Sequence, residues 1–205
     1  VFQNPMASPD ILGASSGAAF GAAIAIFFGA SRREITISAF AFSLATVCIV
    51  YFIGQRARGY RVVNLILAGI MISSLFTAGV SYVKLVADPS NQLPTITYWL
   101  MGSLSGAKMH ELGFVAIPMA LGLVPLFLLR WRINILTLGD DEARTMGINA
   151  NALRFGVILC STLVTAASIS VTGMIGWVGL VIPHLCRRIV GSDYRYLLPA
   201  GARAG

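Results

Sequence analysis

The chain consists of long apolar blocks separated by short polar segments. Within each block the apolar residues are nearly continuous and do not alternate with polar ones, which favours helices in lipid over the strands of a barrel. Six blocks can be delimited, at residues 11–29, 35–54, 65–87, 112–129, 153–171 and 174–190, and a seventh begins near Leu197. Because a helix needs about 20 apolar residues to cross a bilayer, the pattern predicts an all-α, polytopic transmembrane helical bundle of roughly six to seven spans.

The composition supports this class of protein. Hydrophobic residues make up 57% of the chain and charged residues only 11%, with a mean hydropathy of +0.80. About a quarter of the residues of a soluble domain are charged. Residues 1–205 therefore read as a single transmembrane domain. Since the chain starts at Val1 and stops within a pattern, we expect it to be part of a longer protein.

Three cysteines, Cys48, Cys160 and Cys186, occur singly inside apolar runs. None has a neighbouring Cys or His at the spacing of a metal site. We expect buried thiols rather than disulfides or metal ligands.

Charge orients the predicted bundle. Consecutive spans alternate sides, which divides the loops into two sets of very different basicity. The richer set holds Arg56, Arg58, Arg61, Arg130, Arg132, Arg144, Arg154, Arg187, Arg188, Arg195 and Arg203, whereas the other holds Arg32, Arg33, Lys84 and Lys108. The positive-inside rule places the richer set in the cytoplasm. Because the net charge of +7 lies between apolar blocks rather than on one surface, we predict no nucleic-acid partner.

The segment between the third and fourth blocks differs from the other connections. Its prolines and Asn end one helix, and "ITYWLMG" is too short to cross a bilayer. Tyr98 and Trp99 are typical of a membrane interface. The segment predicts a short helix lying at the membrane surface.

The first block contains a stripe of glycines. Gly13, Gly17 and Gly21 are four residues apart, and nothing larger than Ala or Ser occurs between Gly13 and Ala19. In lipid, this spacing lets another helix come into backbone contact. Close packing is therefore favoured over a wall that lines a substrate passage.

A second stripe runs through the third block. Its members share one helix face and are small or hydroxylated: Gly69, Ser73, Thr77 and Ser81. The hydroxyls can bond to the carbonyl four residues earlier, which requires no function. They can equally form a mildly polar wall along a passage, and the residues alone leave both alternatives open.

No acidic residue, lysine or histidine lies near the middle of any block, so a proton relay or charge-coupled ion carrier has no obvious components. The densest charged segment lies between the fourth and fifth blocks, where Asp140, Asp141 and Glu142 can start a short helix that Gly147 ends. Such a helix could dock a cytoplasmic partner. On these residues alone a solvated connector is favoured.

The sixth block and its flanks contain "TGMIGWVGLVIPHLCRRIVGSDYRYLLP". Its glycines permit a tight turn, and Pro183 predicts a break or kink in the helix. His184 has no second His or carboxylate placed to help it. Neither "GSLSGAK" nor "GASSGA" has the residues of a phosphate loop or a serine protease. We predict no catalytic residue, no metal site and no cofactor.

Five segments together resemble one family: "NPMASPDILGASSGAAFGA", "LILAGIMISS", "YWLMGSLSG", "LGDDEARTMGI" and "GMIGWVGLVIPHLCRRIVGSDYRYLLPA". In this order they are similar to FecCD-type permease subunits of ABC importers for iron-siderophores, haem and cobalamin. The resemblance covers essentially the whole chain. It implies a ten-span permease, of which this chain lacks the first span, most of the second, and everything after the start of the ninth.

The resemblance also implies roles for particular residues. The cytoplasmic gate would include Asn4, Pro5, Met6, Arg61 and Asn64, and the helix that carries Gly69, Ser73, Thr77 and Ser81 would line the central pathway. Asp140, Asp141, Glu142, Ala143 and Gly147 would belong to the segment that couples to the ATPases. The family signature would comprise Gly179, Pro183, His184, Arg187, Gly191, Asp193 and Arg195, with a supporting rather than chemical role.

The partners implied are two cytoplasmic ATP-binding cassette ATPases, an extracytoplasmic substrate-binding protein, a second permease copy and the lipid bilayer. The location implied is the inner or plasma membrane of a prokaryote, with transport by alternating access. The particular chelate does not follow from the sequence. Two alternatives stay open, namely an intramembrane enzyme that uses His184 and a passive channel.

Overall fold

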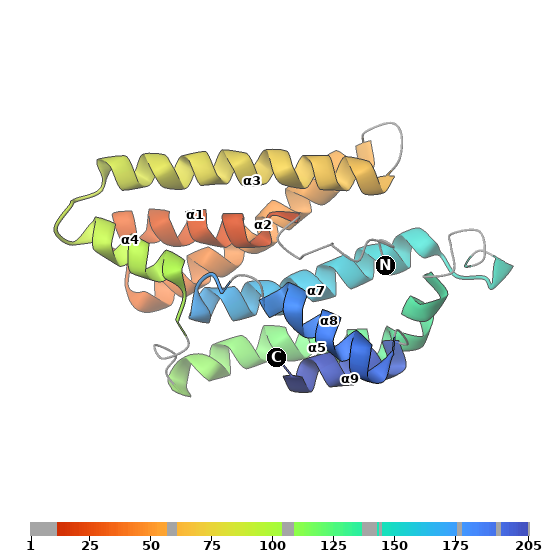
Figure 1. Ribbon diagram of the computed structural model, residues 1–205. Helices are drawn as coiled ribbons and strands as arrows, with labels where there is room; N and C mark the ends of the chain where they lie inside the picture. The colour runs from red at the N-terminus through yellow and green to blue at the C-terminus, as the bar shows by residue number, and fades with distance from the viewer. Residues whose placement is uncertain are drawn as a thin grey trace. The chain divides into compact units, whose positions relative to one another are not determined.

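The protein is all-helical throughout the residues that its computed structural model describes, which are 12–56, 61–103, 109–136, 143, 145–175, 178–191 and 194–204. The helices are α1 (Ala14–Phe27), α2 (Arg32–Arg56), α3 (Arg61–Val86), α4 (Gln92–Met101), α5 (Met109–Leu136), α7 (Ala150–Thr172), α8 (Val178–Val190) and α9 (Tyr194–Ala204) (Figure 1). The predicted fold class is confirmed.

Four of the described helices are long and apolar enough to cross a membrane, namely α2, α3, α5 and α7. α1 has 14 residues and α8 has 13. At 1.5 Å per residue these two are about 20 Å long, short of a hydrocarbon core of about 30 Å. The sixth block is shorter as a helix than the apolar pattern indicates, because Met174 and Ile175 lie outside it.

The chain divides into two compact units. The first unit comprises Pro9–Met119 and Thr165–Ile175, and the second comprises Val1–Ser8, Ala120–Val164 and Gly176–Gly205. α5 and α7 therefore contribute residues to both units.

In the first unit, α1, α2 and α3 pack against one another. Ala18, Ala22 and Ala39 are fully buried where α1 meets α2. Side chains this small let two helix backbones approach closely, which is a main source of helix association in lipid. A second cluster, which includes Ile26, Val83 and Ile96, buries the far end of α1 against α3 and α4.

α4 is the short helix that the sequence predicts between the third and fourth blocks. Ile96 is almost fully buried, whereas the Tyr98 side chain is 74% exposed. The amide of Gln92 donates a hydrogen bond of 2.9 Å to the carbonyl of Phe27, which ties the start of α4 to the end of α1. One face of α4 thus covers the bundle and leaves Tyr98 at the surface.

The second unit has its own core. Leu136, Ala143 and Leu153 are buried together where the chain passes from α5 to α7. α8 and α9 pack side by side, with Cys186 and Leu197 buried. The sequence predicts that a seventh block starts near Leu197. In the structure, α9 begins at Tyr194, and Leu197 is buried within it.

Candidate transport and coupling surfaces

The glycines of α1 form its contact with α2. A β-carbon added to Gly17 would overlap the hydroxyl of Thr46 and come within 2.8 Å of the carbonyl oxygen of Phe42. A β-carbon added to Gly21 would lie 2.7 Å from the carbonyl oxygen of Ser38, whose hydroxyl donates a 2.8 Å hydrogen bond to the Gly21 carbonyl. The preference for close packing over a substrate-lining wall is confirmed at these two positions.

α1 begins inside the bundle. Gly13 precedes it with φ = 78°, a left-handed conformation that glycine adopts without strain. A β-carbon on Gly13 would lie 2.9 Å from the Ser73 hydroxyl and 3.1 Å from Thr46, both well inside α3 and α2. α1 thus starts partway along α2 and α3, which makes the helix of the first block short.

The small-residue stripe of α3 changes its surroundings along the helix. Positions four apart drift by about 40° per step around an α-helix. Gly69 is buried, whereas Thr77 and Ser81 are exposed. Thr77 donates a 2.8 Å hydrogen bond to the Ser73 carbonyl, and Ser81 donates one of 3.0 Å to the Thr77 carbonyl. These hydroxyls are satisfied within the helix and also lie on an open face, and their role in the wall of a passage remains a prediction.

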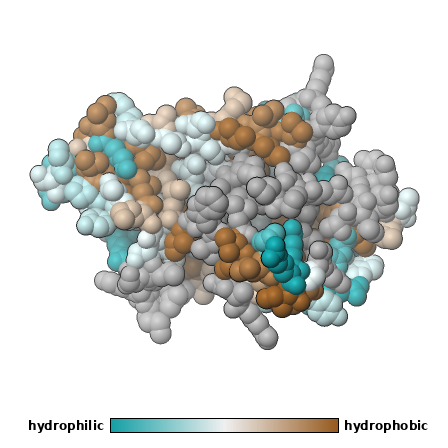
Figure 2. Space-filling view, viewed as in Figure 1, coloured by the Kyte–Doolittle hydropathy of each residue, from teal (hydrophilic) through white to brown (hydrophobic). Residues whose placement is uncertain are grey.

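That open face of α3 is mostly apolar. Met71 is 70% exposed and Leu75 is 65% exposed, with Leu67 and Tyr82 also at the surface. Figure 2 shows apolar side chains at the surface where α3 runs in Figure 1. A surface of this kind suits contact with lipid or with another membrane helix, and the hydroxyls of Thr77 and Ser81 add sparse polar positions.

The loops assigned to the less basic side meet in the first unit. Besides the bond from Gln92 to Phe27, the Ser103 amide donates a 2.7 Å hydrogen bond to the carbonyl of Thr172, at the end of α7. Gly102 and Gly173 both have positive φ and lie in contact, since a β-carbon on Gly173 would be 2.9 Å from the Gly102 α-carbon. The ends of α1, α4 and α7 thus lie together, as alternation of the spans requires.

Loops assigned to the arginine-rich side meet in the second unit. The Arg130 guanidinium, near the end of α5, donates a 3.5 Å hydrogen bond to the Arg195 carbonyl in α9. Arg187 and Arg188 lie in the last turn of α8, where positive charge complements the helix dipole. The cytoplasmic assignment of this side remains a prediction from the arginine count.

The predicted gate is only partly described. Asn4, Pro5 and Met6 lie outside the described residues. Arg61 is the first residue of α3, and the half-buried Asn64 lies in its first turn. The segment from Arg61 to Asn64 is therefore helical, and its role as a gate remains a prediction.

The predicted coupling segment ends in a defined turn. Asp140, Asp141 and Glu142 lie outside the described residues, whereas Ala143 is fully buried. Gly147 has φ = 73°, and the Ile148 amide donates a 2.9 Å hydrogen bond to the Ala143 carbonyl. This is the Schellman arrangement that closes a helix, completed by packing of Ala143 with Ile148. Gly147 ends the segment as predicted and is itself exposed.

The predicted signature residues lie on α8 and around its end. α8 runs through Pro183, so of the predicted break or kink the helix shows no break there. Pro183 lies in the first half of α8, where the missing amide removes one intrahelical hydrogen bond. Gly191, with φ = 83°, ends α8 through a 3.1 Å hydrogen bond from its amide to the Arg187 carbonyl. Gly179 lies in the first turn of α8 and Asp193 outside the described residues.

His184 and Arg195 are exposed, on α8 and α9 respectively. In the described part of the chain, no three His, Cys, Asp or Glu side chains gather into a group that could hold a metal ion.

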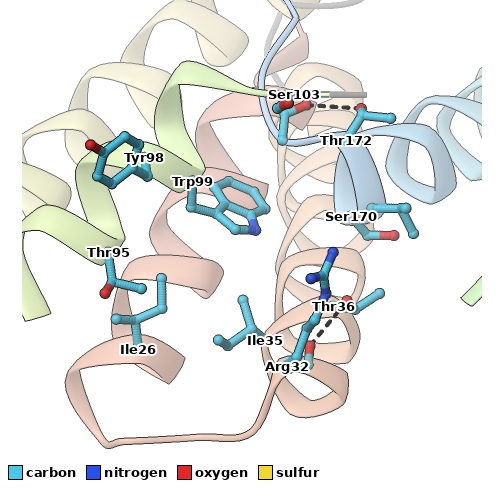
Figure 3. Close-up of a pocket in the computed structure, with 12 residues that line it drawn as sticks. Ile26, Arg32, Ile35, Thr36, Thr95, Tyr98, Trp99, Ser103, Ser170 and Thr172 are labelled. Carbon is cyan, nitrogen blue, oxygen red and sulfur yellow. Dashed lines mark hydrogen bonds between the residues drawn. The ribbon is translucent and has the colours of Figure 1, made fainter. Parts of the chain in front are cut away.

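A cavity that the sequence does not single out lies in the first unit. It has a volume of about 410 Å³ and is bordered by the start of α2, by α4 and by the end of α7, with Arg32, Trp99 and Ser170 among its lining residues (Figure 3). The sequence signals were Arg32, just before the second apolar block, and the pair Tyr98–Trp99. Only the fold brings them together.

These features define a polytopic helical membrane protein whose helices pack through glycine. The model of the FecCD transport family matches residues 1–205, and the chain belongs to this family. Membership and the apolar helices locate the protein in the cell membrane, as predicted.

The relatives of this chain are named for several cargoes. The chain is 38% identical over 205 residues to the molybdate import system permease protein MolB of Haemophilus influenzae, covering all of this chain and 61% of the relative. It is 37% identical over 212 residues to the hemin transport system permease protein HmuU of Yersinia pestis, covering all of this chain and 63% of the relative. The chain thus spans about three fifths of the length of these curated relatives.

The fold also matches a solved structure. With a TM-score of 0.92 and 38% identity, 99% of this chain superimposes on 65% of a protein described as a metal-chelate type ABC transporter in an inward-facing conformation. At this similarity the fold is shared.

Proposed function

We propose that the chain is the membrane-spanning core of an ABC importer permease, which moves its cargo by alternating access while separate cytoplasmic ATPases supply the energy. The observation that carries the proposal is the family match over the whole chain. The absence of charged side chains near the middle of the apolar blocks agrees with an external energy source.

The proposed division of labour follows the two units. In the first unit, the glycine contact between α1 and α2 makes a rigid body, and the open face of α3 with Thr77 and Ser81 borders the pathway next to a second permease copy. In the second unit, the segment that ends at Gly147 docks on the ATPase. Motion of that segment then tilts α3 and exposes the pathway on one side at a time. An extracytoplasmic binding protein would deliver the cargo.

The proposed cargo is a metal chelate or a metal oxyanion. Relatives are named for molybdate, hemin and, in Halobacterium salinarum, cobalamin import. The sparse hydroxyls and apolar side chains of α3 fit a pathway that holds its cargo weakly. The proposed class of cargo includes the iron-siderophores, haem and cobalamin expected from the sequence. Metal oxyanions are added to it because one relative is named for molybdate import.

Uptake into vesicles tests the proposal. The full-length permease, reconstituted with its ATPase and binding protein, should accumulate labelled cargo only when ATP is supplied on the ATPase side. Accumulation without ATP or without the ATPase would show a passive channel. Turnover of a substrate by the purified permease alone, lost in a His184→Ala variant, would show an enzyme. Either result would overturn the proposal.

A further inference from the structure

The cavity between α2, α4 and α7 has the chemistry of a zwitterion site. Among the described residues, its lining contains one charged side chain, Arg32, and a second strong donor in the indole N–H of Trp99. Figure 3 shows the Arg32 guanidinium and the Trp99 ring extending into the same space from α2 and α4. A guanidinium has five N–H donors, so Arg32 can bind a phosphate and keep other contacts.

The hydroxyls of the lining present acceptors. Thr36 donates its hydrogen to the Arg32 carbonyl at 3.1 Å, Thr95 to the Asn91 carbonyl at 2.7 Å, and Ser170 to the Ala167 carbonyl at 2.9 Å. Each oxygen keeps lone pairs after this donation. A ligand that meets both sets of groups needs an anionic acceptor and an N–H donor within one small molecule.

The lining of the cavity also contains the residue types expected at the depth of the lipid headgroups. Arg32 is the first residue of the apolar span Arg32–Arg56, and Tyr98 and Trp99 are the aromatic residues typical of a membrane interface. Ile26, Ile35 and Val171 provide an apolar wall. About 410 Å³ is in the range of small-molecule sites.

We propose that this cavity binds the phosphoethanolamine headgroup of a membrane phospholipid. The phosphate lies on Arg32 and the Trp99 N–H, and the ammonium donates to the hydroxyl oxygens of Thr36 and Ser170, which lie on the same side of Trp99 as Arg32. The glycerol backbone follows the apolar wall toward the bilayer. The site requires no assumption about transport or cargo.

The test uses the delipidated full-length protein in detergent, with binding of soluble dihexanoyl lipids measured by calorimetry. Dihexanoyl-phosphatidylethanolamine should bind. The phosphatidylcholine analogue, whose ammonium has no N–H, and the phosphatidylglycerol analogue, which has no ammonium, should bind about tenfold more weakly or worse, because at least one charge-assisted hydrogen bond is lost. Free O-phosphoethanolamine lacks the apolar part and should bind more weakly still.

Two charge-removing variants distinguish binding at this site from nonspecific electrostatic attraction of the lipid to the protein surface. Arg32→Gln should weaken binding of the ethanolamine lipid about tenfold or more. Arg33→Gln is the matched control, because it removes the same charge from an exposed neighbour outside the lining, and it should leave affinity unchanged. If Arg32→Gln fails to fold, Trp99→Phe keeps the ring, removes the N–H and should give a smaller loss.

Three results would overturn the proposal. They are equal affinity for the three lipids, equal effects of Arg32→Gln and Arg33→Gln, and binding of O-phosphoethanolamine or inorganic phosphate as tight as that of the lipid. The first two would exclude a headgroup site, and the third would indicate a site for the free anion.

Discussion

Replacement of Gly17 tests the glycine contact on which the first unit depends. In Gly17→Ala, the new methyl group meets three atoms of α2, which are the Thr46 hydroxyl, the Thr46 β-carbon at 2.8 Å and the Phe42 carbonyl oxygen at 2.8 Å. The Thr46 hydroxyl cannot rotate away without cost, because it donates a 2.6 Å hydrogen bond to that same carbonyl. The backbone oxygen cannot move independently of α2.

Relief therefore requires α1 and α2 to separate by several tenths of an ångström along a contact that also buries Ala18, Ala22 and Ala39. Overpacking of this kind costs about 1–3 kcal/mol, and Gly17→Leu, with three further carbons, should exceed that range and prevent assembly or transport. Stability is measured by equilibrium unfolding of the full-length protein in mixed micelles. Assembly is measured separately, by size-exclusion chromatography of samples without denaturant.

Gly156→Ala is the matched control. Gly156 lies inside α7, and a β-carbon there meets nothing within 4 Å. Alanine has the higher helix propensity, so stability should stay the same or rise by up to about 1 kcal/mol. If Gly17→Ala unfolds like the wild type, or if Gly17→Leu assembles and transports normally, α1 and α2 are not packed through this glycine.

Three further outcomes are expected. Gly147→Pro cannot adopt the φ of 73° that closes the coupling segment, and Glu142→Arg reverses a charge in that segment. Each variant should uncouple ATP hydrolysis from uptake while the permease stays in the membrane. Unchanged uptake in either variant would contradict the coupling assignment. His184→Ala should leave uptake unchanged, because the side chain is exposed. Gly102→Ala should lower the free energy of unfolding by about 1–3 kcal/mol, because φ is 69° and the new β-carbon would lie 2.6 Å from the Met174 carbonyl oxygen. A variant as stable as the wild type would show that the close contact between the end of α4 and the residues after α7 is not required for stability.

The apolar pattern predicted the long helices well because lipid imposes one requirement on all of them. Every backbone polar group in the hydrocarbon must be bonded within the chain, so a continuous apolar block becomes a helix. The glycine spacing likewise predicted the contact of α1 with α2, since only the absence of a β-carbon lets the Phe42 carbonyl approach Gly17 so closely.

Helix ends were harder to predict. The sixth block begins with apolar residues that are not helical, because α7 ends at Thr172, Gly173 takes a positive φ and α8 starts only at Val178. Hydropathy does not distinguish an apolar turn from an apolar helix. The start of α1 at Gly13 was also hidden, because it depends on contacts with Thr46 and Ser73 that come from other helices.

The cavity around Arg32 shows the same limit for sites. Its lining comes from segments separated by more than a hundred residues, and no local motif links Arg32 to Ser170. Hydrogen-bond direction decided its chemistry, because the hydroxyls of Thr36, Thr95 and Ser170 each donate within their own helix. That direction can be seen only once the backbone is in place.

Alternating access along α3 is the central claim, and thiol accessibility tests it most directly. Single cysteines would replace Val63, exposed near the start of α3, and Ser81, exposed near its end, in a full-length protein whose Cys48, Cys160 and Cys186 are replaced. The assembled transporter would be labelled with a hydrophilic maleimide, with and without ATP and vanadate. We predict reciprocal changes, with one cysteine gaining reactivity as the other loses it. Two cysteines that react alike in both conditions, or in neither, would contradict alternating access along this helix.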